Sequence, residues 1–174
     1  MNQPEIRRTV KSEIQIAFRG VTLGAGMSLR QAQLADRSGD AARNPLRGSF
    51  GSREVVDDWS QVTLDELERD CIAHRDAAGF RYYIPALMLS VLNHYDPASM
   101  RVIGTLGDLY PKKDRSWKYH MHRYSLLNHA QKTAVARFLA ALPNLVDLDL
   151  ADQKIVSRAL RNYWGEYLQP SPAE

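Results

Sequence analysis

The sequence predicts a mainly α-helical protein built as a single compact multi-helix domain, and three observations lead to this fold class. Apolar residues recur at three- and four-residue spacing over most of the chain, which is the period of amphipathic helices. The 174 residues, 44% of them hydrophobic, are enough for one substantial core. The single cysteine, Cys71, rules out an internal disulfide, so apolar burial has to stabilise the fold. We expect one domain over residues 1–168 and a flexible tail over 169–174.

The N-terminal part is expected to hold two helices and a loop. The first helix should extend from about Pro4 to Phe18, because apolar residues recur there every four positions and Gly20 follows. Ser28 is a suitable N-cap for a short second helix. Residues 38–53 contain three glycines and a proline and show no periodicity, so we predict a surface loop there, the least ordered internal stretch.

Two capping boxes mark the beginnings of later helices. In Thr63–Glu66 the threonine hydroxyl can accept from the glutamate amide while the glutamate side chain reaches back to the threonine amide, and a helix should follow to about Ala73. Asn128–Gln131 has the same arrangement and introduces a helix that we expect to end at Pro143. A last helix is expected over residues 150–168.

The centre of the chain reads Gly-Phe-Arg-Tyr-Tyr-Ile-Pro-Ala over Gly79–Ala86 and is its most distinctive segment. Residues 80–84 are β-prone and precede a proline, so we predict one short extended aromatic segment there. Pro85 then suits the first turn of the next helix. In an extended segment Phe80, Tyr82 and Ile84 would face the core, whereas Arg81 and Tyr83 would face a groove or a partner.

Two residue patterns are candidates for catalysis, and each also has a simpler interpretation. His120 and His122 lie two residues apart, which in an extended segment places both imidazoles on one side, as in some metal sites. They are the basis for an alternative function, a metal-assisted hydrolase, but no further ligand lies at a supporting spacing. Cys71 with His74 three residues later could form a nucleophile and base, although a free cysteine is more often a small buried hydrophobe. The sequence has no phosphate-binding or dinucleotide-binding motif, so we expect no cofactor.

Charge is distributed unevenly around a net value of +3. Acidic residues gather between positions 54 and 70, and five of them could dock a basic partner by charge complementarity. These are Asp57, Asp58, Asp65, Glu66 and Glu68. The basic segment 112–124 interleaves cations with aromatic residues, including Lys113, Arg115 and Trp117. Such interleaving is typical of partner-binding loops and of single-stranded nucleic-acid binders, which is a second alternative function.

Several segments together resemble an uncharacterised, largely bacterial family of helical domains of unknown function. The similarity covers about residues 13–165. It is carried by Glu13-Ile14, Ala17-Phe18, Val21–Gly24, Ser28-Leu29, Asp58-Trp59, Gly79–Ala86, Leu127, Gln131, Phe138-Leu139 and Tyr163-Trp164. The resemblance implies one helical fold and assigns no catalytic residue.

From these observations we expect a non-enzymatic cytoplasmic protein that binds another protein. No apolar run reaches the roughly 20 residues needed to cross a bilayer, so no membrane association is expected. The sharpest form of the hypothesis is an immunity-type protein that neutralises a bacterial toxin. The partner-binding residues would be those of the acidic set, Arg81, Tyr83 and the three residues named in the basic segment.

Overall fold

The computed structural model describes residues 2–29, 31, 57–69 and 76–169. Within these ranges the chain is helical and contains no strand, which confirms the predicted fold class. The elements in order are α1 (Gln3–Ala17), η2 (Trp59–Gln61), α3 (Leu64–Arg69), α4 (Ala77–Asn93), α5 (Met100–Asp108), α6 (Trp117–Tyr124), α7 (His129–Leu145), α8 (Leu150–Asn162) and η3 (Trp164–Leu168), where η marks a 3-10 helix. The predicted loop 38–53, Cys71, His74 and the tail beyond residue 169 lie outside the described residues.

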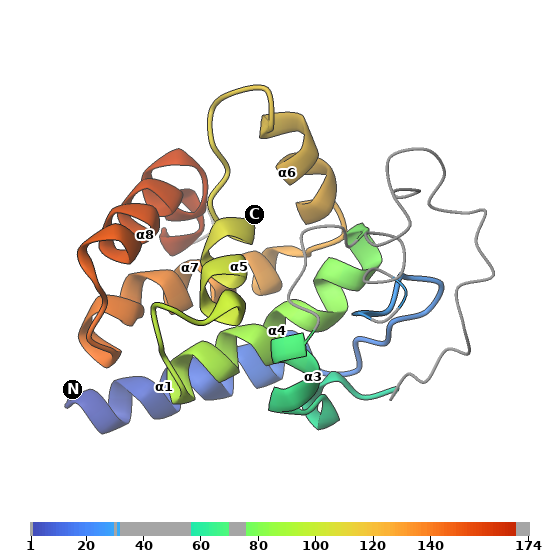
Figure 1. Cartoon of the computed structure of the whole chain (residues 1–174), viewed down its shortest axis with the longest axis horizontal. Helices are drawn as coiled ribbons and strands as arrows, with labels where there is room; N and C mark the ends of the chain where they lie inside the picture. The colour runs from blue at the N-terminus through green and yellow to red at the C-terminus, as the bar shows by residue number, and fades with distance from the viewer. Residues whose placement is uncertain (1, 30, 32–56, 70–75, 170–174) are drawn as a thin grey trace.

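Helix α4 is the central element of the fold. It contacts α1, α5, α6, α7 and η2, and Figure 1 shows these helices packed around it. A helix that is apolar on every side has to be enclosed by other elements. Thirteen of its seventeen residues are buried, among them Phe80, Tyr82, Ile84 and Leu87. The core therefore surrounds α4 rather than lying along one stripe of it.

The predicted extended aromatic segment is wrong, because residues 80–84 are the second turn of α4. The helix begins at Ala77, before this segment, and its N-cap is Asp76, whose carboxylate accepts from the Gly79 amide at 2.7 Å. Pro85 lies inside the helix instead of starting one. An interior proline costs about 3 kcal/mol, but burial of the surrounding aromatic and aliphatic side chains on all sides offsets that cost.

Both predicted capping boxes are confirmed. The Glu66 carboxylate accepts from the Thr63 amide at 2.7 Å, and the Glu66 amide donates to the Thr63 hydroxyl at 3.3 Å. Asn128 and Gln131 form the reciprocal pair at 2.9 and 3.1 Å. The expected end of this helix at Pro143 is wrong, because α7 continues to Leu145.

Two further boundaries differ from the prediction. The basic segment 112–124 does not hold His120 and His122 in an extended conformation, because its second half forms α6, in which Arg123 and Tyr124 are buried. The last predicted helix over 150–168 is interrupted at Tyr163, where φ is −152° and ψ is −58°. The chain then turns into η3, whose Trp164 is fully buried and donates its indole N–H to the Leu109 carbonyl at 2.7 Å. This bond fixes η3 to the end of α5.

Candidate functional site

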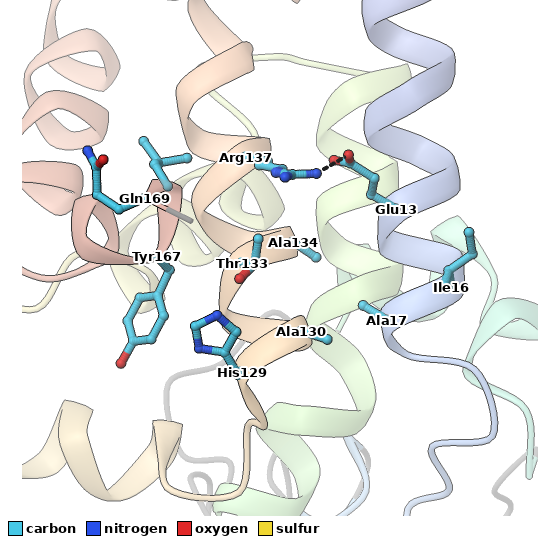
Figure 2. Close-up of a pocket in the computed structure, with 11 residues that line it drawn as sticks. Glu13, Ile16, Ala17, His129, Ala130, Thr133, Ala134, Arg137, Tyr167 and Gln169 are labelled. Atoms are coloured by element: carbon cyan, nitrogen blue, oxygen red, sulfur yellow. Dashed lines mark hydrogen bonds and ion pairs between the residues drawn. The ribbon is translucent and has the colours of Figure 1, made fainter. Parts of the chain in front are cut away.

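A groove of about 490 Å³ lies between α1, α7 and η3. Figure 2 shows the residues that line it, with α7 between α1 on one side and η3 on the other. The lining residues are Glu13, Ile16, Ala17, His129, Ala130, Thr133, Ala134, Arg137, Tyr167, Leu168 and Gln169. Concave, mostly apolar sites of this size are where proteins commonly bind ligands or partner side chains.

The floor of the groove is made of small side chains. Ala130, Thr133 and Ala134 lie three and four positions apart and therefore share one face of α7. Ala17, the last residue of α1, extends this floor towards the neighbouring helix. A floor of methyl-sized groups leaves room for a larger side chain to be inserted above it.

Both walls of the groove carry a large apolar side chain that is exposed to solvent. Ile16 on α1 is 61% exposed, and Leu168 at the end of η3 is 40% exposed. Each leaves apolar area in contact with water, which is unfavourable by about 25 cal/mol per Å². An occupant that covered both side chains would recover that free energy.

The wall formed by α1 is held in place by polar contacts to α7. Buried Gln131 donates its side-chain N–H to the Ala17 carbonyl at 3.2 Å, while its own side-chain oxygen completes the α7 capping box. One turn up the groove, the Arg137 guanidinium pairs with the Glu13 carboxylate across the two helices, as the dashed line in Figure 2 marks. These contacts set the width of the groove on this side.

The opposite wall is fixed by a chain of contacts centred on Tyr167. Lys132 donates to the Tyr167 hydroxyl at 3.3 Å, and that hydroxyl donates to the Tyr163 hydroxyl at 3.2 Å. The ring of Tyr167 meets the imidazole of His129 at a centroid separation of 5.8 Å. Burial and the neighbouring Tyr163 and Glu166 raise the pKa of Tyr167, so its hydroxyl remains a neutral donor. The wall is preorganised before any occupant arrives.

The charged groups around the groove are already engaged within the protein. Arg137 is paired with Glu13, and Lys132 lies over the rings of Tyr163 and Tyr167 at 5.8 and 5.3 Å. The groove consequently offers apolar surface with hydrogen-bonding side chains at its rim. Within the described residues there is no group of three His, Cys, Asp or Glu side chains that could hold a metal ion. The arrangement is suited to binding an uncharged apolar group.

The predicted acidic residues lie in two places, and all five are exposed. Asp57 and Asp58 border η2 and line a second hollow together with Arg19. The Asp58 carboxylate accepts from the Ser60 amide at 2.9 Å, and this hydrogen bond lowers the pKa of Asp58.

The other three acidic residues are on α3. Glu66 belongs to the capping box, Glu68 lies 3.7 Å from the guanidinium of buried Arg101, and Asp65 is in the first turn of the helix. Partner binding by the acidic set stays a prediction, because at least three of its members also have a local structural role.

The expected facing of Tyr83 is wrong, because alternation applies to a strand and this residue is on a helix. Tyr83 is only 5% exposed, and its hydroxyl accepts from the Leu29 amide at 3.3 Å. Arg81 is half-buried on α4. Tyr83 is therefore a core residue, and a partner-binding role for Arg81 stays a prediction.

The two histidines of the hydrolase hypothesis do not share a side. His120 and His122 are on α6, where a separation of two residues turns the side chains away from each other. His120 is half-buried, with its Nδ1 3.4 Å from the Tyr124 hydroxyl. Burial, followed by the charge of Arg123, lowers the pKa of His120. His122 is exposed.

The remaining predicted residues lie around the beginning of α6. Lys113 and Arg115 are exposed in the turn that leads into the helix. Trp117, the first residue of α6, is half-buried and meets the ring of Tyr163 at 6.2 Å. It contributes to packing between α6 and η3.

Sequence reasoning missed the groove. Its best available signal is Ile16, which falls outside the four-residue apolar stripe of α1 and so predicts an exposed apolar side chain on that helix. Nothing in the local pattern indicated that η3 would approach α7.

Comparison with known proteins gives one match. No curated protein and no solved structure matches the chain. No helix among the described residues has the length and apolar character to cross a membrane. The model of one family matches residues 6–168. This range includes every element from η2 to η3 and every groove residue except Gln169. The chain therefore belongs to the Family of unknown function (DUF6714).

Proposed function

We propose that this protein is a non-enzymatic cytoplasmic protein-binding module that receives an apolar, uncharged side chain of its partner in the groove between α1, α7 and η3. The observation that carries the proposal is the exposure of Ile16 and Leu168 on opposite walls above an alanine floor. Interfaces obtain most of their binding energy from a few large anchors in such preformed pockets.

The charge balance of the groove supports the choice of an uncharged anchor. A charged side chain would lose its hydration on entry and would find the cation of Arg137 and the anion of Glu13 already paired with each other. A leucine, methionine or aromatic side chain has no such penalty and gains from burial of the walls. The rim residues His129 and Gln169 can hydrogen-bond the partner backbone around the anchor.

An immunity-type role, in which the protein neutralises a bacterial toxin, is the specific form that we propose for this function. The exposed acidic set would add charge complementarity to a basic toxin, and the groove would supply the anchor site. The measurement is survival of cells that express a candidate toxin with and without this protein. If growth is equally poor in both, or if rescue is unaffected by groove substitutions, this specific form is wrong.

The function itself can be tested by crosslinking from the edge of the groove, so that the floor stays open for the partner's side chain. A photoreactive phenylalanine analogue at the exposed lining position Gln169 should form one defined protein adduct in the native host, whereas the same analogue at Leu150 on α8 should not. Ile16→Glu should abolish the adduct by placing a charge on the wall.

Leu150→Glu is the matched control, because Leu150 is an exposed apolar residue, 74% accessible, outside the groove. An adduct that survives Ile16→Glu would contradict the proposal. A small molecule, instead of a protein, found crosslinked in the groove would also contradict it.

A further inference from the structure

A second surface is defined by the exposed side of α6 and the turn before it. Lys118, Tyr119 and His122 lie on one side of α6, because they are separated by one and three residues, and Arg115 lies in the turn just before the helix. All four are exposed, as are Lys112 and Lys113 just upstream. We call these six residues the α6 cationic face.

This face carries a local surplus of positive charge. Between residues 112 and 122 there are four lysines and arginines against one acid, Asp114, a surplus of three. The net charge of the chain is also +3, so all other positions together are balanced. A local surplus of this kind attracts polyanions.

The nearby acids do not cancel the surplus. Asp108 forms a buried bidentate pair with Arg123, which is not part of the face. Asp114 accepts from the Ser116 amide and hydroxyl at 2.7 and 2.6 Å. These hydrogen bonds, followed by the charges of Lys112 and Arg115, lower the pKa of Asp114. Asp114 therefore stays charged but offsets only one of the four cations.

An aromatic ring lies in the middle of the cations. Tyr119 is 45% exposed, and its ring is oriented by the guanidinium of Arg123, 5.3 Å from the ring centroid. A ring that is nearly half exposed and held by a neighbouring cation can serve as the platform on which nucleobases stack in single-strand binders. An acidic protein surface would use the cations but would gain little from such a ring.

We propose that the α6 cationic face binds single-stranded nucleic acid, with its lysines and arginines on the phosphates and Tyr119 stacked on a base. The eight residues of α6 extend for about 12 Å, which matches a short run of nucleotides. Contacts to three or four phosphates give a salt slope, in log Kd against log salt concentration, of about 2 to 3. This inference does not depend on the groove.

The test uses the full chain and fluorescence anisotropy with labelled 20-nucleotide oligothymidine and oligouridine at several NaCl concentrations. We expect binding that weakens with salt along that slope. Lys118→Glu should weaken it about tenfold or more and reduce the slope. Lys154→Glu, an exposed lysine on α8, is the matched control and should have a much smaller effect. Tyr119→Leu should weaken binding about fivefold, and Tyr119→Phe should retain it.

Three results would overturn the inference. The first is no salt-dependent binding of either oligonucleotide. The second is an equal loss for Lys118→Glu and Lys154→Glu, which would show only diffuse attraction. The third is full competition by polyglutamate together with an unchanged affinity of Tyr119→Leu, which would assign the face to an acidic protein. Thermal unfolding of each variant separates these results from loss of folding.

Discussion

The guanidinium of Arg123 and the carboxylate of Asp108 face each other inside the protein through two parallel hydrogen bonds of 2.8 and 2.9 Å. The ring of Phe80 on α4 lies 4.8 Å from the same guanidinium. The backbone carbonyl of Asp108 accepts from the Tyr124 hydroxyl at 2.6 Å. One ion pair therefore connects the end of α5, the end of α6 and the central helix.

Removal of one member of this ion pair should lower the free energy of unfolding far more than removal of both. Asp108→Asn leaves a buried cation without its counter-charge, and we expect a loss of about 3–5 kcal/mol in the free energy of unfolding. The double variant Asp108→Leu/Arg123→Met should lose clearly less than the single one, because neither partner is left unpaired. Urea denaturation measures both. Asp114→Asn, a change at an exposed carboxylate, serves as the control, and a single variant as stable as this control would contradict the prediction.

His120 should make stability depend on pH. Burial and Arg123 lower its pKa in the folded state below the ordinary value of 6.5. The unfolded chain then binds more protons in the interval between the two pKa values, so the free energy of unfolding falls as pH drops below about 6.5.

We expect His120→Gln to reduce the difference in unfolding free energy between pH 7.5 and 5.5, measured by urea denaturation at both values. His122→Gln, at an exposed position on the same helix, should leave the difference unchanged. Identical pH dependence of wild type and His120→Gln would show that His120 is not responsible.

Replacement of two glycines, Gly165 and Gly107, by alanine should change the stability of the protein in opposite directions. A Cβ added at Gly165 would lie 2.8 Å from the Leu160 carbonyl oxygen, so Gly165→Ala has to displace backbone and should cost about 1–3 kcal/mol. At Gly107 in α5 a Cβ would meet nothing within 4 Å, so Gly107→Ala should stabilise by about 0.5–1 kcal/mol through helix propensity. Thermal melts of the two variants test the pair, and a shift of the same sign in both would refute it.

The Tyr95 hydroxyl should stabilise the junction between α4 and α8. It donates to the Asp152 carboxylate at 2.8 Å and accepts from the Asp149 amide at 3.1 Å. Burial raises the pKa of Tyr95 to about 12, so it remains a donor at neutral pH. Tyr95→Phe should cost about 1–3 kcal/mol, because the carboxylate of buried Asp152 loses its donor. If the Tyr95→Phe variant unfolds at the same urea concentration as the wild type, this prediction is wrong.

The helical class, the two capping boxes and most helix beginnings could be predicted from sequence, because they depend on local chemistry within one or two turns. Residues 80–84 could not, because their conformation is decided by neighbours. Isolated aromatic residues before a proline favour an extended chain, but the helix is favoured by contacts of α4 with five other elements, which leave Tyr82 and Ile84 fully buried. The same applies to α6, which is stabilised by Asp108 from another helix.

The groove could be predicted even less. Its floor is made of small residues, Ala130, Thr133 and Ala134 with Ala17, which resemble those of any helix interior, and its walls come from opposite ends of the sequence. Capping by Gln131 could be predicted from its spacing to Asn128, whereas its contact with Ala17 required the tertiary structure. Candidate sites that depend on side chains from one segment, such as His120 and His122, were predicted from the wrong conformation of that segment.

The walls that carry Ile16 and Leu168 are separated by about 150 residues of chain. Contacts so distant in sequence carry a high loop-closure entropy and tend to form late in folding. The groove can thus be complete only once α1 and η3 have both docked onto α7. A ligand that needs both walls would select fully folded molecules, and its binding would report the integrity of the whole protein.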